Sequence, residues 1–341
     1  MASLTLALDI MGGDNGPPVT LAGAKKALLA YPSLNLVLCG DEAQITPIVS
    51  QWPKSFASRY RIEHCTEQVS MDDRPTFALR NKRDSSMHRM LNLVKHEKAD
   101  ACVSAGNTGA LMAIAYYVLK TLPGVDRPAL ISSLPTASHH KVYLLDLGAN
   151  VNCDSEILFQ YAMMGSVLAE QVSGIDKPRV ALLNVGLEQI KGNDQVKQTA
   201  QILSNTPGIN FIGYVEGHDI FTDKADVVVT DGFAGNIALK SCEGFAKLVL
   251  HEAKRLSNQN ILTKIMAKVA LPLLRKIYLR MNPDQYNGAS LIGLRGIVVK
   301  SHGNANSDAF LYAIKEAIQE VSRQVPTKIK DKIETVLMER P

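Results

Sequence analysis

Glycine and short polar side chains follow directly after six apolar runs of the sequence. These runs end at Ile10, Ser104, Leu147, Val185, Thr230 and Lys300. Glycine lets the backbone approach a ligand closely, while asparagine and aspartate side chains form hydrogen bonds and cap helices. A single loop of this kind is usually an ordinary tight turn. Six of them in one chain favour a shared binding site.

The residue types in these loops suit a small anion. The candidate binding residues are Asp9, Gly12, Gly13, Asn107, Thr108, Asn150, Asn193, Asp231 and Gly235, and the candidate catalytic residues are Lys191, Asn236 and His302. Backbone N–H groups at helix N-termini bind a phosphate or a carboxylate, and one lysine can add the countercharge. The same donors would stabilise an oxyanion that develops during a reaction. Because no serine or cysteine with a neighbouring base can be recognised, we do not expect a covalent intermediate.

Other kinds of site lack their sequence signatures. The patterns G-x-G-x-x-G, G-x-x-x-x-G-K-[ST], H-E-x-x-H and G-x-S-x-G do not occur, so we expect neither a cofactor nor a metal. The five cysteines are scattered without a C-x-x-C pair, which is typical of a reduced cytosolic protein. A net charge of +4 is too weak to favour nucleic acid, although a local basic patch can bind an acidic partner. With no leader-like segment at its start, the chain is expected to be soluble.

Strands and helices that alternate along the chain must position the six loops. Buried strands are expected at residues 4–10, 35–39, 101–104, 142–147, 180–185, 210–215, 227–230 and 297–300, and weaker ones at 61–65 and 129–132. Helices are expected to begin near residues 17, 42, 75, 108, 155, 188, 233 and 304. This order predicts an α/β fold, an α/β/α sandwich with a mainly parallel sheet, as a single unit over residues 1–341. All six loops should then meet in one crevice at the carboxyl edge of the sheet.

A basic and apolar segment near the end of the chain has two interpretations. Residues 253–283 contain seven basic residues and no acidic one, and Pro272 divides them into two amphipathic stripes. We expect a protruding helical hairpin at 254–285. Its cationic faces and the side chains of Leu271, Leu273, Leu274 and Ile277 suit contact with an anionic membrane. The same apolar faces would equally suit a dimer interface.

Motifs that occur in order along nearly the whole chain resemble those of PlsX-type phosphate acyltransferases. They are Asp9-Ile-Met-Gly-Gly-Asp, Arg80-Asn-Lys-Arg-Asp-Ser-Ser-Met, Ser104-Ala-Gly-Asn-Thr-Gly-Ala, Arg127-Pro-Ala-Leu, Leu145-Asp-Leu-Gly-Ala-Asn, Asn184-Val-Gly through Lys191-Gly-Asn, Tyr214-Val-Glu-Gly-His-Asp-Ile, Asp226-Val-Val-Val-Thr-Asp-Gly-Phe-Ala-Gly-Asn and Tyr286-Asn-Gly-Ala-Ser-Leu-Ile-Gly through His302-Gly. The departures are small: Ile10 stands where the family commonly has alanine, and Asn287 and Ser290 where glycine and proline are usual.

The resemblance implies a homodimeric enzyme of bacterial phospholipid synthesis. It would transfer a fatty acyl group from acyl carrier protein (ACP) to inorganic phosphate by direct attack on the thioester. The acyl phosphate would then feed a membrane acyltransferase that acylates glycerol 3-phosphate, so the enzyme would be cytoplasmic and peripherally associated with the membrane. The fold would resemble phosphotransacetylases and the isocitrate and isopropylmalate dehydrogenases. The rivals are another enzyme of this fold and a non-catalytic protein that binds lipid or ACP.

Roles for individual residues follow from the needs of this reaction. Lys191 with nearby backbone N–H groups would bind phosphate, and Asn236 or Asn107 would contact the oxyanion or the phosphopantetheine arm. His302 would protonate the leaving thiolate. Asp9 and Asp231 would orient these groups, because bare carboxylates repel phosphate.

One basic segment could bind the strongly acidic carrier protein. Residues 74–89 contain five basic side chains and one acid, and Arg80, Lys82 and Arg83 are the candidate docking residues. A solvated helix face would explain these charges almost as well.

Overall fold

The expected apolar runs form the strands of one sheet. The computed structural model describes the chain except for residues 1–3, 139, 258, 260–268, 271–286 and 340–341. In the described part, eleven strands are hydrogen-bonded in the order β3-β2-β1-β4-β11-β10-β5-β6-β9-β7-β8. Their bounds are β1 (Leu4–Asp9), β2 (Leu34–Gly40), β3 (Tyr60–His64), β4 (Ala101–Ser104), β5 (Ala129–Pro135), β6 (Lys141–Leu145), β7 (Arg179–Leu183), β8 (Asn210–Val215), β9 (Val227–Val229), β10 (Ala289–Ile292) and β11 (Ile297–Lys300).

The sheet contains two parallel groups that run in opposite directions. One group is β1, β2, β3, β4 and β11, and the other is β6, β7, β8 and β9. Between them, β10 is antiparallel to both β11 and β5, and β5 is antiparallel to β6. The carboxyl ends of β1, β4 and β11 therefore lie at one edge of the sheet, here called edge A. Those of β6, β7 and β9 lie at the opposite edge, here called edge B.

Helices connect the strands, and their starts carry local capping signals. Their bounds are α1 (Gly16–Ala30), α2 (Glu42–Val49), α3 (Pro75–Asn81), α4 (Ser86–Lys95), α5 (Thr108–Leu119), α6 (Ser155–Ser173), α7 (Asp194–Ser204), α8 (Gly232–Ser257), α10 (Ser307–Ser322) and α11 (Val325–Glu339), with short 3-10 helices η1 (Lys54–Phe56) and η2 (Gly217–Asp219). The side-chain oxygens of Asn107, Asn193 and Asn306 accept backbone hydrogen bonds at the starts of α5, α7 and α10. Each therefore pairs donors that a helix N-terminus leaves unpaired.

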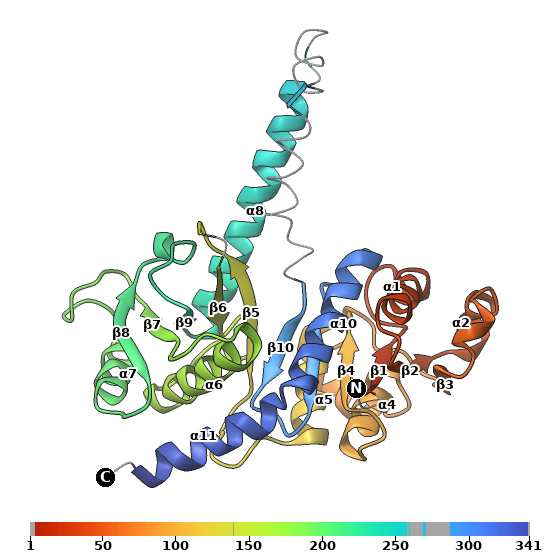
Figure 1. The fold of residues 1–341 in the computed structure, drawn as a ribbon, viewed down its shortest axis with the longest axis horizontal. Coiled ribbons are helices and arrows are strands. Elements are labelled where there is room, and N and C mark those ends of the chain that lie inside the picture. Colours follow the sequence, from red (N-terminus) through yellow and green to blue (C-terminus); the bar gives the residue numbers. More distant parts are fainter. Residues whose placement is uncertain (1–3, 139, 258, 260–268, 271–286, 340–341) are drawn as a thin grey trace.

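Alternating side chains of the strands build a core on each face of the sheet. Leu6 and Leu8 of β1 belong to the core formed with α1 and α10, whereas Ala7 belongs to the core formed with α4 and α5. In the other half, Tyr143 and Leu145 of β6 pack in a core with α6 and α11. Helices thus cover both faces, as Figure 1 shows. The predicted α/β/α sandwich is confirmed.

Helix α8 begins in the sheet region and projects away from it, as seen at the top of Figure 1. Its 26 residues correspond to a length of about 39 Å. Most of the hairpin expected at 254–285 lies outside the described residues, and so do the candidate membrane-contact residues Leu271, Leu273, Leu274 and Ile277. Among the described helices, none is both long enough and apolar enough to cross a bilayer.

The predicted elements form, but the predicted meeting of six loops at one edge is wrong. All ten predicted strands are present, and seven of the eight predicted helices begin within three residues of the expected positions. The exception is α7, which begins at Asp194 and not near residue 188. The sequence does not predict β10, α4 or α11. Because β10 is antiparallel to both neighbours, β5 runs in the same direction as β11, and the β5–β6 hairpin then reverses the direction. Three of the six loops therefore lie at edge A and three at edge B.

Candidate active site

A buried carboxylate organises the loops at edge A. Asp9 ends β1, and its carboxylate accepts hydrogen bonds of 2.6 Å from the hydroxyls of Ser86 and Ser104. Ser104 Oγ in turn accepts one of 3.0 Å from the backbone N–H of Gly106. Burial raises the pKa of Asp9, while the two serines and the charge of Lys300 act in the other direction. Asp9 is only 2% exposed, so it holds the loops after β1 and β4 together rather than facing a ligand.

A buried lysine and an asparagine fix the loop that follows β11. Lys300 Nζ donates hydrogen bonds to the backbone oxygens of Ala105, at 3.3 Å, and Ser301. Burial lowers the pKa of Lys300 to about 8. Asn287 Oδ1 accepts a hydrogen bond of 2.9 Å from the backbone N–H of His302. The imidazole of His302 therefore extends from a fixed backbone, and its side chain is 41% exposed.

Two glycines let the β1 loop pack against its neighbours. A Cβ at Gly12 would lie 2.6 Å from Asp9 Oδ2 and 2.8 Å from the backbone nitrogen of Gly106. Gly13 has a φ of +88°, and a Cβ there would lie 2.8 Å from the backbone oxygen of Gly303. Gly12 and Gly303 also border a small hollow. The close approach of three backbone segments is what requires glycine here.

A second buried carboxylate organises edge B. Asp146 follows β6, and its Oδ1 accepts hydrogen bonds of 3.0 Å from the backbone N–H groups of Leu130 and Ala149. Its Oδ2 accepts one of 2.6 Å from the backbone N–H of Asn150. The side-chain amide of Asn150 donates to the hydroxyl of Tyr161 at 2.6 Å. Burial raises the pKa of Asp146, and these hydrogen bonds oppose that rise. Asp146 and Asn150 thus hold the loop after β6.

The first turn of α8 packs directly on the loop after β6. The backbone N–H of Gly232 donates to the backbone oxygen of Asn150 at 2.8 Å. The side chain of Asp231 accepts a hydrogen bond of 2.8 Å from the backbone N–H of Ala234. The helix cap and the backbone hydrogen bond together fix where α8 begins and in which direction it leaves the sheet.

Gly235 and Asn236 define the next contact between α8 and edge B. A Cβ at Gly235 would overlap the backbone oxygen of Asp146, so only glycine fits at this point of the helix. Asn236 is exposed, and a Cβ at Gly148 would lie 3.5 Å from its Cβ and Cγ. The amide of Asn236 is therefore presented beside the β6 loop.

Helix α8 connects edge B with edge A. Asn236, Lys240 and Glu243 are spaced i, i+4 and i+7, which places them on one side of the helix. The rise from Asn236 to Glu243 is about 10 Å. Glu243 Oε1 lies 3.9 Å from His302 Nε2, and Glu243 Oε2 lies 2.9 Å from Lys240 Nζ. The charge of Lys240 also acts on the buried Lys300. The first three turns of α8 thus form a wall that both groups of loops share, and this is the candidate active site.

Lys191 lies in the loop after β7, at edge B. Its Nζ lies 3.0 Å from Glu188 Oε1, and its side chain is 48% exposed. The amide of Asn184 donates to the backbone oxygens of Gly186, at 3.0 Å, and Lys191, at 3.3 Å. Since Gly192 takes a φ of +92°, the loop turns sharply before α7. An anion that binds Lys191 must compete with Glu188 for the ammonium group.

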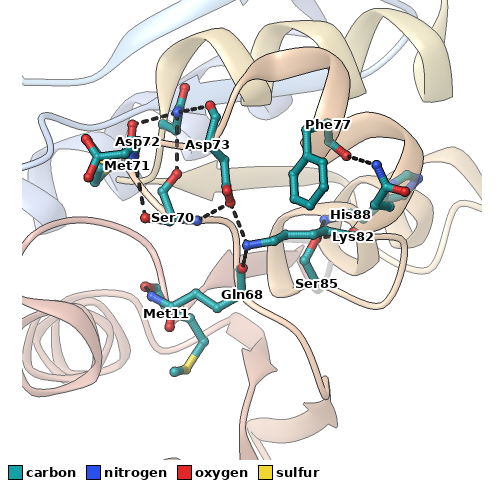
Figure 2. Close-up of polar contacts among 12 residues, drawn as sticks. Met11, Gln68, Ser70, Met71, Asp72, Asp73, Phe77, Lys82, Ser85 and His88 are labelled. Atoms are coloured by element: carbon teal, nitrogen blue, oxygen red, sulfur yellow. Dashed lines mark hydrogen bonds and ion pairs between the residues drawn. The ribbon is translucent and has the colours of Figure 1, made fainter.

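The basic segment contains a lysine that holds a neighbouring loop. Lys82 Nζ donates to Asp73 Oδ2 at 2.6 Å and to the backbone oxygen of Gln68 at 2.7 Å, as Figure 2 shows. Gln68 Nε2 donates in turn to the backbone oxygen of Met11 at 2.7 Å. Lys82 is therefore tied through Gln68 to the β1 loop, which leaves the exposed Arg80 and Arg83 as the docking candidates of this segment.

One group of described side chains has the spacing of metal ligands. Glu216, His218 and Asp219 lie together after β8. Asp219 Oδ1 already lies 2.5 Å from Lys224 Nζ, and this lysine lowers the pKa of the carboxyl. Glu216 and Asp219 also form a reciprocal capping box around η2. These contacts give the group a structural role in its turn.

Several predicted site residues hold the loops instead of facing the wall. Asp9, Asn150, Asn193 and Asp231 are engaged as described. Asn107 caps α5 and also donates to the backbone oxygens of Met71, at 2.8 Å, and Asp73, at 3.0 Å. The side chains of Lys191 and His302 in the loops, of Thr108 at the start of α5 and of Asn236 in α8 are exposed or half-exposed.

The structure adds supporting residues that the sequence prediction missed. They are Ser86, Ser104, Asp146, Lys240, Glu243 and Lys300. Ser104, Asp146 and Lys300 end strands or directly follow them, which was a usable signal. Lys240 and Glu243 could have been found only from their helical spacing after Asn236.

The chain is similar to proteins of known name over its full length. A family described as "Fatty acid synthesis protein" matches residues 4–328. A phosphate acyltransferase of Pseudoalteromonas atlantica is 66% identical over 340 residues, covering 100% of both chains. One of Shewanella sp. strain MR-4 is 55% identical over 339 residues, covering 99% of both. The chain belongs to the fatty acid synthesis protein family.

Solved structures outside this fatty acid synthesis protein family share its fold. The phosphotransacetylase of Streptococcus pyogenes has a TM-score of 0.61 at 16% identity, and 94% of each chain is covered. The EutD phosphotransacetylase of Staphylococcus aureus has a TM-score of 0.57 at 18% identity, again with 94% of each chain covered. The predicted likeness to the phosphotransacetylase fold is confirmed. The relatives that are 66% and 55% identical show that this member of the fatty acid synthesis protein family is an acyltransferase.

Proposed function

We propose that the protein transfers a fatty acyl group from ACP to inorganic phosphate. Hydrogen phosphate attacks the thioester carbonyl carbon, the C–S bond breaks, and acyl phosphate and the free thiol of ACP are formed. The supporting observation is the wall formed by α8, which places Asn236 and the Glu243–His302 pair between the loops of edges A and B. It occurs in a chain that is similar over its whole length to phosphate acyltransferases.

Three side chains would carry the reaction. The ammonium group of Lys191, with backbone N–H groups of its loop, binds phosphate. The exposed amide of Asn236 donates a hydrogen bond to the oxyanion that forms on the carbonyl oxygen. The imidazolium of His302 protonates the thiolate as it leaves. Phosphate attacks directly, without a covalent intermediate. Much of the rate would therefore come from holding the phosphate and the thioester in position against the wall of α8.

The assay that tests this function measures acyl phosphate directly. The full chain is incubated with acyl-ACP, inorganic phosphate and EDTA, and the product is trapped with hydroxylamine. We expect acyl hydroxamate to accumulate with enzyme and phosphate concentration. A folded protein that yields no product would contradict the proposal and favour a non-catalytic lipid- or ACP-binding protein.

Docking of ACP is proposed at Arg80 and Arg83. Both side chains are exposed, and ACP is strongly acidic. In Arg83→Glu, the apparent KM for acyl-ACP should rise several-fold while kcat changes little, and added salt should reduce the difference. Lys54→Glu, a matched charge reversal at another exposed position, is the control. Equal effects of the two variants would show that only net charge matters.

Attachment to a membrane surface is proposed for the same enzyme. The product carries a long acyl chain, and the membrane acyltransferase that acylates glycerol 3-phosphate would consume it. Flotation with anionic vesicles should show binding that decreases with salt and is lost in Leu274→Glu. If flotation of that variant is unchanged, the segment around Leu274 does not bind the membrane, and a dimer interface is its alternative role.

A further inference from the structure

The carboxylate of Glu243 and the imidazole of His302 come together from distant parts of the sequence. Glu243 lies in the third turn of α8, and His302 lies in the loop after β11. Glu243 Oε1 is 3.9 Å from His302 Nε2, and the carboxylate side chain is only 18% exposed. Its other oxygen, Oε2, contacts Lys240 Nζ at 2.9 Å. The acid is therefore held in place and partly shielded from water.

The packing of both elements fixes this pair. The hydrogen bond from Gly232 to Asn150 and the close approach of Gly235 to Asp146 set the position of α8 along its axis. The hydrogen bond from its backbone N–H to Asn287 fixes His302. A pair that depends on two such independent constraints is not a chance contact of flexible surface chains.

Other charged groups around His302 also act on its protonation. Two cations belong to the same region: Lys240 contacts Glu243, and its charge acts on the buried Lys300, two residues before His302. Like charges near an imidazole would disfavour its protonated form. Asp9 of β1 and Asp14 of the following loop are acids whose charges act on Lys300. Asp9 is held by two serines, and Asp14 Oδ2 would lie 3.6 Å from a Cβ at Gly303. In the described part of the chain, Glu243 is the acid within ion-pair distance of the imidazole.

We propose that Glu243 is a positioning residue that orients His302 and stabilises its imidazolium form. This inference rests on the proposed function. The imidazolium donates its proton to the thiolate sulfur when the C–S bond breaks. It recovers a proton when hydrogen phosphate becomes the acyl phosphate, so the proton count balances over one turnover. Without the neighbouring carboxylate, two lysines would leave His302 neutral over more of the working pH range.

The decisive comparison is between Glu243→Gln and Glu252→Gln. Both changes remove one carboxylate from α8, and both break an i, i+3 ion pair: Glu243 with Lys240, and Glu252 with Arg255 at 2.8 Å. Among the ion pairs of the described residues, Glu243 has a histidine partner and Glu252 does not. Since the active form is protonated, kcat is high below the titration midpoint of His302 and falls as pH rises through it. In Glu243→Gln the falling limb should move to lower pH by about half a unit or more, and in Glu252→Gln it should stay.

A second measurement does not depend on turnover. NMR titration of the histidine ring, with the His302 signal assigned by its loss in His302→Gln, should show the same shift to lower pH in Glu243→Gln. Lys240→Met should shift the midpoint the other way, because it removes a cation and frees the carboxylate for His302. An unchanged midpoint in both variants, or an equal shift in Glu252→Gln, would overturn the proposal. If the wild type forms no acyl phosphate, the proposed function fails, while the titration still decides whether the pair exists.

Discussion

Most of the acids and amides in the strand-end loops stabilise those loops. Asp9 and Asp146 are buried, and each accepts several hydrogen bonds from neighbouring segments. Asn107 and Asn150 donate to backbone oxygens or to a tyrosine hydroxyl. The residue types in the sequence predicted that these loops form a binding site. They could not predict which side chains face inward, because that depends on segments far away in the chain.

Removal of Lys191 should reduce turnover while the protein stays folded. We expect kcat/KM for phosphate to fall by well over tenfold in Lys191→Ala, because a binding site for an anion loses its cation. Glu188→Gln should have the opposite effect on binding. It removes the carboxylate that lies 3.0 Å from Lys191 Nζ, so the KM for phosphate should decrease. Steady-state kinetics at fixed acyl-ACP measure both, and a near wild-type rate for folded Lys191→Ala would exclude this lysine from phosphate binding.

The buried Lys300 should make stability depend on pH. Its pKa in the folded protein is about 8, below the ordinary 10.5, so the unfolded chain binds more protons between these pH values. The free energy of unfolding of the wild type should therefore rise from pH 8 to pH 10.5 relative to Lys300→Met, by up to about 3 kcal/mol. Urea denaturation at pH 8 and pH 10 measures the difference. Equal pH dependence in the two proteins would show that folding does not lower the pKa of Lys300.

At the level of elements, the attachment of α8 to edge B sets the geometry of the wall. A Cβ at Gly235 would overlap the backbone oxygen of Asp146. Gly235→Ala should therefore shift α8 from β6 and lower both the melting temperature and kcat, with a loss of about 1–3 kcal/mol in stability. Gly244→Ala, on the same helix and with no atom of the described residues within 4 Å of its Cβ position, is the control and should stabilise by about 0.5–1 kcal/mol. Thermal unfolding and the hydroxamate assay decide this, and equal behaviour of the two variants would contradict a tight contact.

The elements themselves could be predicted from the sequence, but the direction of half the sheet could not. Strands such as β1 and β4 are runs of buried apolar residues, which is a strong signal. β10 spans only Ala289–Ile292 and has no comparable pattern. A usable signal was the connection between Pro135 and Lys141, since five residues allow a hairpin but no parallel crossover. That hairpin alone separates the loops of edge A from those of edge B.

At the level of the whole molecule, α8 connects three regions that differ in chemistry. Its start contacts the loop after β6, its third turn contacts His302, and its distal half projects from the body (Figure 1). A continuous helix has no hinge between these points unless proline or a bulge interrupts it. A change at the projecting end can therefore reach Glu243 as a rigid displacement. A partner that binds the projecting end can thus change the position of Glu243 in the active site.

The projecting half of α8 is expected to be covered by a second copy of the chain. Phe245, Leu248 and Leu256 are 68%, 56% and 50% exposed, and large apolar side chains gathered on one projecting helix favour association. Phe245→Asp combined with Leu248→Asp should therefore change the mass measured by light scattering from that of a dimer to that of a monomer. Leu29→Asp removes a similarly exposed leucine from α1 and should leave the dimer intact. If the wild type is monomeric, or if the double variant stays dimeric, this face of α8 does not form the dimer interface. The membrane is then the alternative, and vesicle flotation of the double variant would show whether the same side chains bind it.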